Sequence, residues 1–228
     1  MPSEFPGGRF DENVLRTTPG LYPDLLMPLE QRLPAPPGQW RSLWVTVRVP
    51  ARSAAGGHEI KLVLTAAGAV VGEAVFVLEV LPVTLPAQKL KHTSWFHTDC
   101  IATQYDVDVW SRQHWGLVEQ FVRSAVDHGV NMLLTPLFTP PLDTQVGGER
   151  PTVQLIDVRV TSKDRYNFNF SRFDRWVRIA DAAGVRFLEM SHLFTQWGAV
   201  HCPKIVARIN GRERKIFGWK DNASGGRY

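Results

Sequence analysis

Residues 110–138 read WSRQHWGLVEQFVRSAVDHGVNMLLTPLF, and this stretch decides the class of fold. Apolar side chains recur at helical spacing from Trp115 to Val126, which predicts an amphipathic helix. Ser111 is placed to cap its start, and Gly129 to end it. The apolar run VNMLLTPLF (130–138) follows at once and predicts a buried strand. A helix that leads directly into a buried strand is typical of α/β architecture.

The same alternation continues on both sides of this stretch. TSWFHTD (93–99) and VRFLEM (185–190) predict short strands, and SRFDRWVRIADAAG (171–184) predicts a second helix. Such strands are expected to be parallel, with right-handed crossovers. A closed barrel of eight strands needs about 250 residues. Residues 93–228 are therefore predicted to be the first βα units of an incomplete (β/α)8 (TIM) barrel.

Two hairpins interrupt the alternation. VQLIDVRV (153–160) and RYNFNF (165–170) flank a polar TSKD turn and predict an inserted hairpin. KIVARINGRERKIFGW (204–219) predicts another, with Asn210-Gly211 as the strongest short turn signal.

The N-terminal part of the chain has a different pattern. Residues 1–42 are rich in Pro and Gly and predict an extended arm, anchored on a partner surface by Leu21, Tyr22, Leu25 and Leu26. Residues 43–84 contain three β-type runs, LWVTVRVP, HEIKLVLTA and GEAVFVLEVLPV. They predict a partial antiparallel β-sandwich. Residues 85–92 read as a linker, so we expect a multi-domain protein.

Composition excludes several classes of function. The net charge is +4, and the basic residues are scattered among acidic ones. They form no basic stripe of the kind that binds nucleic acid. The two cysteines, Cys100 and Cys202, lack metal-ligand spacing. No stretch predicts a signal peptide or a membrane span, so a cytoplasmic protein without membrane contact is expected unless an upstream segment is missing.

Polar side chains follow each predicted strand, where α/β proteins bind their ligands. Carboxylates, imidazoles, hydroxyls and aromatic rings in one patch are typical of a carbohydrate pocket. The substrate-binding candidates are His97, Asp99, Thr139, Asp143, Glu189, His192, Gln196 and Trp197. Tyr105, Thr135 and Thr144 lie in the same loops.

Structural interpretations of these residues are equally open. Glu189 can bind either a substrate or the backbone amides of its own loop, and His97 can be a buried histidine. His192 can cap or orient its loop, and Asp143 suits an Asx turn. Asp99 with Glu189 is a conceivable carboxylate pair for glycoside hydrolysis.

Five runs carry a resemblance to a known family: PGLYPDLL, SWFHTDCIA, LLTPLFTPPLDT, GGERPTVQL and EMSHLFTQWGA. From about Thr17 to Trp219 the chain resembles bacterial proteins of a domain-of-unknown-function family related to glycoside hydrolase family 123. The resemblance implies a β-sandwich followed by a (β/α)8 barrel. It implies hydrolysis of terminal β-linked N-acetylgalactosamine with retention, the acetamido group of the substrate being the nucleophile. The resemblance further implies an adjacent Asp-Glu pair at a strand end, whose Asp orients the acetamide and whose Glu is the general acid/base. It implies no metal or organic cofactor.

The sequence departs from that pattern at the catalytic pair. Its only Asp-Glu dipeptide is Asp11-Glu12 in the arm, and Glu189 is preceded by Leu188. The pair is therefore expected beyond Tyr228, and this chain is expected to be an inactive fragment of a carbohydrate hydrolase. The alternatives are a non-catalytic carbohydrate-binding module and an interaction protein that docks through its Pro-rich arm.

Overall fold

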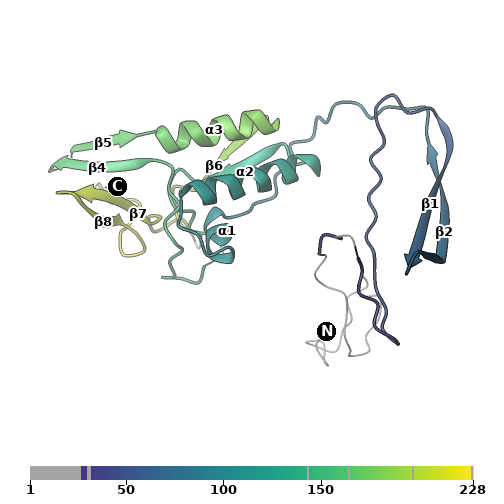
Figure 1. Ribbon diagram of the computed structural model, residues 1–228. Coiled ribbons are helices and arrows are strands. Elements are labelled where there is room, and N and C mark those ends of the chain that lie inside the picture. The colour runs from purple at the N-terminus through teal and green to yellow at the C-terminus, as the bar shows by residue number, and fades with distance from the viewer. Residues whose placement is uncertain (1–26, 30–31, 143, 164, 197, 227) are drawn as a thin grey trace, which may run out of the picture. The chain divides into compact units, whose positions relative to one another are not determined.

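The computed structural model describes residues 27–29, 32–142, 144–163, 165–196, 198–226 and 228. The chain divides into two compact units, Met1–Pro86 and Ala87–Tyr228 (Figure 1). The predicted anchors of the arm, Leu21, Tyr22, Leu25 and Leu26, lie outside the described residues, as do the candidates Asp143 and Trp197.

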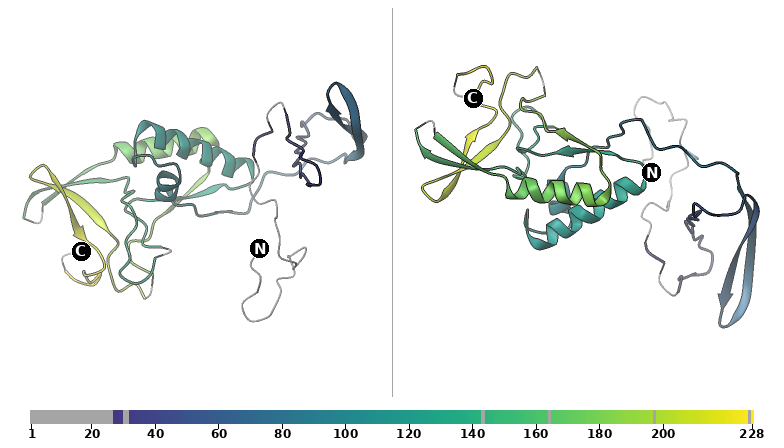
Figure 2. Two further views of the ribbon diagram at one scale, coloured as in Figure 1. Left: turned by 60° about the horizontal axis from the view of Figure 1, so that its bottom comes forward. Right: turned by 90° about the horizontal axis from the view of Figure 1, so that it is seen from above.

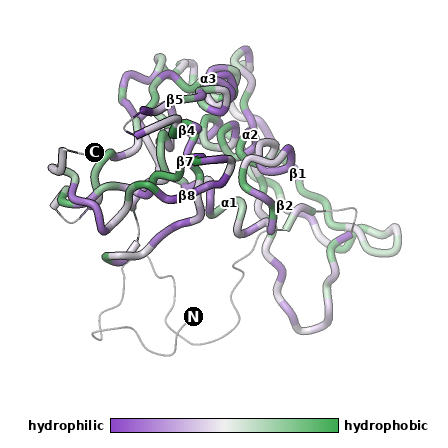
Figure 3. The backbone as a smooth tube through the Cα atoms, turned by 90° about the vertical axis from the view of Figure 1, so that its left-hand side faces the viewer, coloured by the Kyte–Doolittle hydropathy of each residue, from purple (hydrophilic) through white to green (hydrophobic). Residues whose placement is uncertain are grey.

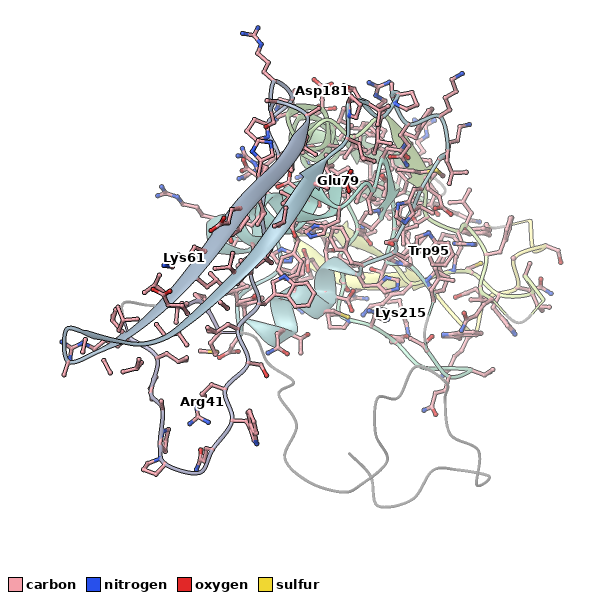
Figure 4. The ribbon with its side chains drawn as sticks, turned by 90° about the vertical axis from the view of Figure 1, so that its right-hand side faces the viewer. Arg41, Lys61, Glu79, Trp95, Asp181 and Lys215 are labelled. Carbon is pink, nitrogen blue, oxygen red and sulfur yellow. The ribbon has the colours of Figure 1, made fainter. Side chains whose placement is uncertain are left out.

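The first unit contains one antiparallel hairpin of β1 (Gly56–Ala66) and β2 (Ala69–Val80). Ala67 and Gly68 form its turn, both with positive φ (50° and 83°), as the twist of a tight hairpin requires. The register places Ile60 opposite Phe76 on an apolar face, while Lys61 lies on the other face and pairs with Glu73 at 2.9 Å. The side chain of Lys61 is labelled on this hairpin in Figure 4.

The prediction of a strand at 43–50 is wrong. Within the described part of the chain these exposed residues form no strand, although their apolar and polar side chains alternate. A strand needs a ladder of hydrogen bonds with a neighbour, and alternation alone does not supply one. The described part of the first unit therefore shows a two-stranded hairpin and no sandwich.

The second unit is built around two parallel strands, β3 (Met132–Thr135) and β6 (Phe187–Met190). Thr93 adds a single parallel bridge to Met132. The helices are α1 (Thr98–Gln104), α2 (Arg112–Asp127) and α3 (Ser171–Ala183). Figure 2 shows α2 and α3 lying side by side on the strands. The buried residues of this core are Ile101, Trp115, Val118, Val122, Leu133, Leu155, Trp176 and Ala180.

The helix boundaries follow local signals. The Ser111 hydroxyl accepts a hydrogen bond from the His114 amide at 3.1 Å, which satisfies one unpaired donor of the first turn of α2. Gly129 follows α2 with a φ of 87°, and Gly184 ends α3 with a φ of 93°. Both glycines adopt the left-handed conformation that closes a helix without a Cβ clash.

The predicted strand at 93–99 is also wrong. Pairing is limited to Thr93, and the Cys100 amide donates to the carbonyl of His97 at 3.0 Å, so that α1 begins at Thr98. His97 and Asp99 therefore lie at the start of a helix and not at the end of a strand. Among the described residues the parallel strands form an open sheet and no closed barrel.

A separate four-stranded sheet has the order β5-β4-β7-β8. Its strands are β4 (Asp157–Ser162), β5 (Arg165–Asn169), β7 (Ile205–Ile209) and β8 (Arg212–Phe217). The predicted turn Asn210-Gly211 joins β7 to β8, with φ values of 48° and 78°. β4 pairs in parallel with β7, so the two hairpins become one sheet. Both predicted hairpins are confirmed.

No helix in the described part of the chain is long and apolar enough to cross a membrane. Cys100 is exposed and Cys202 is buried, and both are free thiols.

Candidate functional site

Trp95, Glu189 and His192 meet at the carboxyl end of the parallel sheet; we call them the Trp95 cluster. Glu189 lies in β6, in register with Leu134 of β3, and His192 follows the strand. The Trp95 indole Nε1 donates to Oε2 of Glu189 at 2.8 Å. The rings of Trp95 and His192 form an edge-to-face pair, and their centroids are 5.6 Å apart.

The cluster is open to solvent. The Trp95 side chain is 45% exposed and is labelled in Figure 4; His192 is exposed and Glu189 is half-buried. An exposed indole offers a flat apolar surface beside a polar edge. A carboxylate whose one oxygen is held by the indole can accept a further hydrogen bond at its other oxygen. This arrangement suits a ligand with an apolar face and several hydroxyl groups.

Asp99 lies in a different environment. It is 3% exposed, and both carboxylate oxygens accept from Arg150, Oδ2 from Nε at 3.0 Å and Oδ1 from Nη2 at 3.3 Å. Arg150 also donates to the carbonyl of Leu142 at 3.2 Å and to Sγ of Cys100 at 3.0 Å. Asp99 therefore holds the loop that follows β3 against the start of α1.

Thr139 and Gln196 bind protein groups at the same end of the unit. The buried Thr139 hydroxyl accepts from the Val153 amide at 3.1 Å. The Gln196 amide donates to the carbonyl of Thr144 at 3.0 Å and links the loop after β6 to the loop after β3. His97 is half-buried directly before α1.

Two of the neighbouring residues named from the sequence contact the helices, Thr135 in the core and Tyr105 at the surface. Thr135 is fully buried, and its hydroxyl accepts from Nε1 of Trp176 at 3.1 Å. Tyr105 lies at the end of α1 with its ring against Phe121 of α2.

Trp95 and Arg150 were missed at the level of sequence. Trp95 stands two positions before His97, so strand alternation would place both on one face; this was the available signal. Arg150 lies in the loop run GGERP, and no local pattern links it to Asp99.

A buried histidine supports the start of α1. Nε2 of His114 lies 2.8 Å from the carbonyl of Thr98, and Nδ1 accepts from the Trp110 amide at 3.0 Å. These partners require the neutral tautomer with its proton on Nε2. Burial lowers the pKa of His114 below its ordinary value of 6.5, against opposing contributions from the Thr98 carbonyl and Asp99. His114 therefore stays neutral while it supports the segment that carries Asp99.

Three further contacts fix the loops around the site. The Tyr228 hydroxyl donates to the carbonyl of Leu193 at 2.5 Å, and burial raises the pKa of Tyr228 to about 12. Glu149 accepts a short hydrogen bond from Lys215, which holds the pKa of Glu149 below its ordinary value. Lys204 donates to the carbonyl of Arg150 at 2.9 Å. The loop that carries Arg150 is thus attached to β8 and to the residue before β7.

Comparisons with known proteins agree with this architecture. The structure is similar to that of a family 123 glycoside hydrolase from Clostridium perfringens, described for the hydrolysis of glycolipid glycans, with a TM-score of 0.51 and 17% identity. The match covers 74% of this chain and 31% of that one, so this chain spans about a third of the length of that protein. This likeness supports the fold.

No curated protein matches the sequence. Residues 95–224, more than half of the chain, match the family described as glycoside hydrolase 123, catalytic domain. The matched range includes Trp95, Glu189 and His192. The resemblance found in the sequence is confirmed, and the chain belongs to glycoside hydrolase family 123.

Proposed function

We propose that this chain forms part of the substrate-binding surface of a glycosidase that acts on terminal β-linked N-acetylhexosamine. The observation that carries the proposal is the Trp95 cluster, an exposed indole hydrogen-bonded to a carboxylate at the carboxyl end of two parallel strands. Trp95 would stack on a sugar ring, and Glu189 and His192 would bind its hydroxyl groups. Family membership supports carbohydrate as the ligand class.

The proposed reaction is substrate-assisted and retaining. The acetamido oxygen of the substrate attacks the anomeric carbon and displaces the leaving group, and water then opens the cyclic intermediate. A carboxylic acid must protonate the leaving oxygen, and a neighbouring carboxylate must orient the acetamide. Asp11-Glu12 is the only adjacent Asp-Glu pair of the sequence, so we assign the acid/base pair to residues beyond Tyr228. The 228-residue chain alone is expected to bind sugar without hydrolysing it.

The same proposal includes the domain plan. Residues 1–42 would be an arm, 43–84 part of a β-sandwich, 85–92 a linker and 93–228 the first part of a (β/α)8 barrel. In the described part of the chain β3 and β6 form a two-stranded sheet, which is too small to close into a barrel. Further βα units would pair with the edges of this sheet.

Calorimetric titration of the chain with methyl N-acetyl-β-galactosaminide tests the binding site. Trp95→Ala should weaken binding about tenfold, which corresponds to ~1.4 kcal/mol. Trp40→Ala is the matched control, since Trp40 is a 96% exposed tryptophan of the first unit. Equal affinities of Trp95→Ala and the unchanged chain would contradict the proposed site. Release of sugar from an aryl N-acetyl-β-galactosaminide by the chain would contradict the assignment of the acid/base pair.

A non-catalytic carbohydrate-binding protein is the second candidate. It is favoured by the engagement of both carboxylates, Asp99 by Arg150 and Glu189 by Trp95. A longer gene product that binds the sugar and turns over no aryl glycoside would support it. Turnover by that longer product would exclude it.

A further inference from the structure

The four-stranded sheet grows from the same edge of the molecule as the Trp95 cluster. β4 follows β3 and β7 follows β6 along the chain, so both hairpins extend from the carboxyl ends of the parallel strands. The two insertions are joined by Gln154, a 4% exposed residue whose amide donates to the Val206 carbonyl and accepts from the Val206 amide, each at 2.8 Å. The sheet projects away from α2 and α3 in Figures 1 and 2.

The two faces of this sheet differ in chemistry. Val158, Ile205, Ala207 and Phe217 pack on one face around the buried Cys202. The other face is mainly polar, with Val206 among its charged and amide side chains, and Figure 3 shows β8 as largely hydrophilic. A groove of about 420 Å³ runs over the polar face and includes Thr152, Gln154, Asn167, Asn169, Arg172 and Arg208 in its lining.

Two arginines lie opposite each other in this groove. Arg159 of β4 is in parallel register with Arg208 of β7, and Asn167 of β5 lies opposite Arg159. Neighbouring strands are about 4.8 Å apart. Like charges directly opposite each other destabilise a sheet, so an anion between them would relieve the repulsion.

The nearby carboxylates do not neutralise both arginines. Asp157 and Glu213 also line the groove, but Asp157 pairs with Arg172 at 2.7 Å, and Glu213 lies 3.8 Å from Arg208. Within the described part of the chain no carboxylate pairs with Arg159. Positive charge therefore exceeds negative charge at the centre of the groove.

We propose that the polar face of the β5-β4-β7-β8 sheet is a second saccharide-binding surface that selects acidic sugars through Arg159 and Arg208. A guanidinium pair suits a sugar carboxylate, because each group presents a planar set of N–H donors. Asn167 and Asn169 supply donors and acceptors for hydroxyl groups. The choice of a saccharide as ligand rests on the proposed function; the preference for negative charge rests on the arginines alone.

The test compares an unsulfated chondroitin tetrasaccharide with its methyl ester, in which the carboxylate charges are removed and the sugar rings are unchanged. The 228-residue chain should bind the acid at least about tenfold more tightly than the ester. Arg159→Gln combined with Arg208→Gln should abolish this difference. Arg159→Lys with Arg208→Lys keeps the charges and should retain part of it, since lysine lacks the bidentate geometry.

The matched control removes two exposed arginines of α2, Arg112→Gln with Arg123→Gln, and should leave the preference intact. Trp95→Ala should leave the preference for the acid over the ester intact, which separates this surface from the Trp95 cluster. Equal binding of acid and ester would overturn the proposal. So would an equal loss in the α2 control, or displacement of the tetrasaccharide by an equimolar concentration of inorganic sulfate.

Discussion

Asp99 and Glu189 are two carboxylates that have a similar local sequence pattern and different environments in the structure. Each follows an apolar run that predicts a strand. Asp99 is buried and has both oxygens on one guanidinium, whereas Glu189 is half-buried and holds a single indole N–H. A buried carboxylate needs a complete set of partners, while a more exposed one can exchange protein for ligand. The difference assigns Asp99 to loop anchoring and leaves Glu189 open to a ligand.

The largest expected effect is that of Asp99→Asn. Removing one charge of a buried pair leaves Arg150 without its counter-ion, which should cost about 3 kcal/mol of unfolding free energy. Urea unfolding of the full chain, followed by tryptophan fluorescence, measures the loss. A cost below about 1 kcal/mol, typical of an exposed pair, would break the contrast with Glu189.

His114 offers a pH-dependent test of the same anchor. Its pKa is lowered by burial in the folded protein, so the unfolded chain binds the proton at a higher pH. Stability contributed by neutral His114 is complete above 6.5, the ordinary pKa, and is lost progressively as the pH falls below it. The urea concentration at the midpoint of unfolding should therefore be lower at about pH 5 than at about pH 8.

His114→Gln is the matched variant for this experiment. It should lose about 1 kcal/mol at neutral pH through poorer hydrogen bonds to Thr98 and Trp110. It should also show a shallower decline with acid, because glutamine does not titrate. Parallel pH curves of the two proteins would show that another group controls the acid sensitivity.

The contrast between local and distant signals explains how much the sequence could predict. The capping of α2 by Ser111, the stop at Gly184 and the Asn210-Gly211 turn depend on neighbouring residues, and each prediction was confirmed. The strands expected at 43–50 and 93–99 depend on partners elsewhere in the chain, and those predictions were wrong.

The site shows the same division. That polar residues would gather after β3 and β6 could be predicted, because ligands bind at the carboxyl ends of strands in such folds. The choice of partner could not be predicted. Asp99 and Arg150 are separated by 51 positions and Trp95 and Glu189 by 94, and no short-range pattern encodes such pairs.

Glu189→Gln should affect stability little. The amide oxygen of glutamine can still accept from the Trp95 indole, so the expected cost is about 0.5 kcal/mol. The same variant should weaken sugar binding about fivefold, because a neutral acceptor binds hydroxyl groups less strongly than a carboxylate does. Calorimetric titration and urea unfolding of one preparation give both numbers. A large loss of stability with unchanged affinity would make Glu189 a second anchor.

The smallest effect is expected from Glu119→Gln, which removes an exposed ion pair with Arg123 one turn further along α2. Both side chains are largely solvated, at 44% and 62% exposure, so the loss should not exceed about 0.5 kcal/mol and should shrink in high salt. This variant shows how much unfolding free energy is lost when a carboxylate with only a surface ion pair is removed. If Glu189→Gln matches it in stability and differs from it in sugar affinity, the role of Glu189 is binding. If the two variants agree in both, Glu189 is an ordinary surface carboxylate, and the sugar site must be sought away from Trp95.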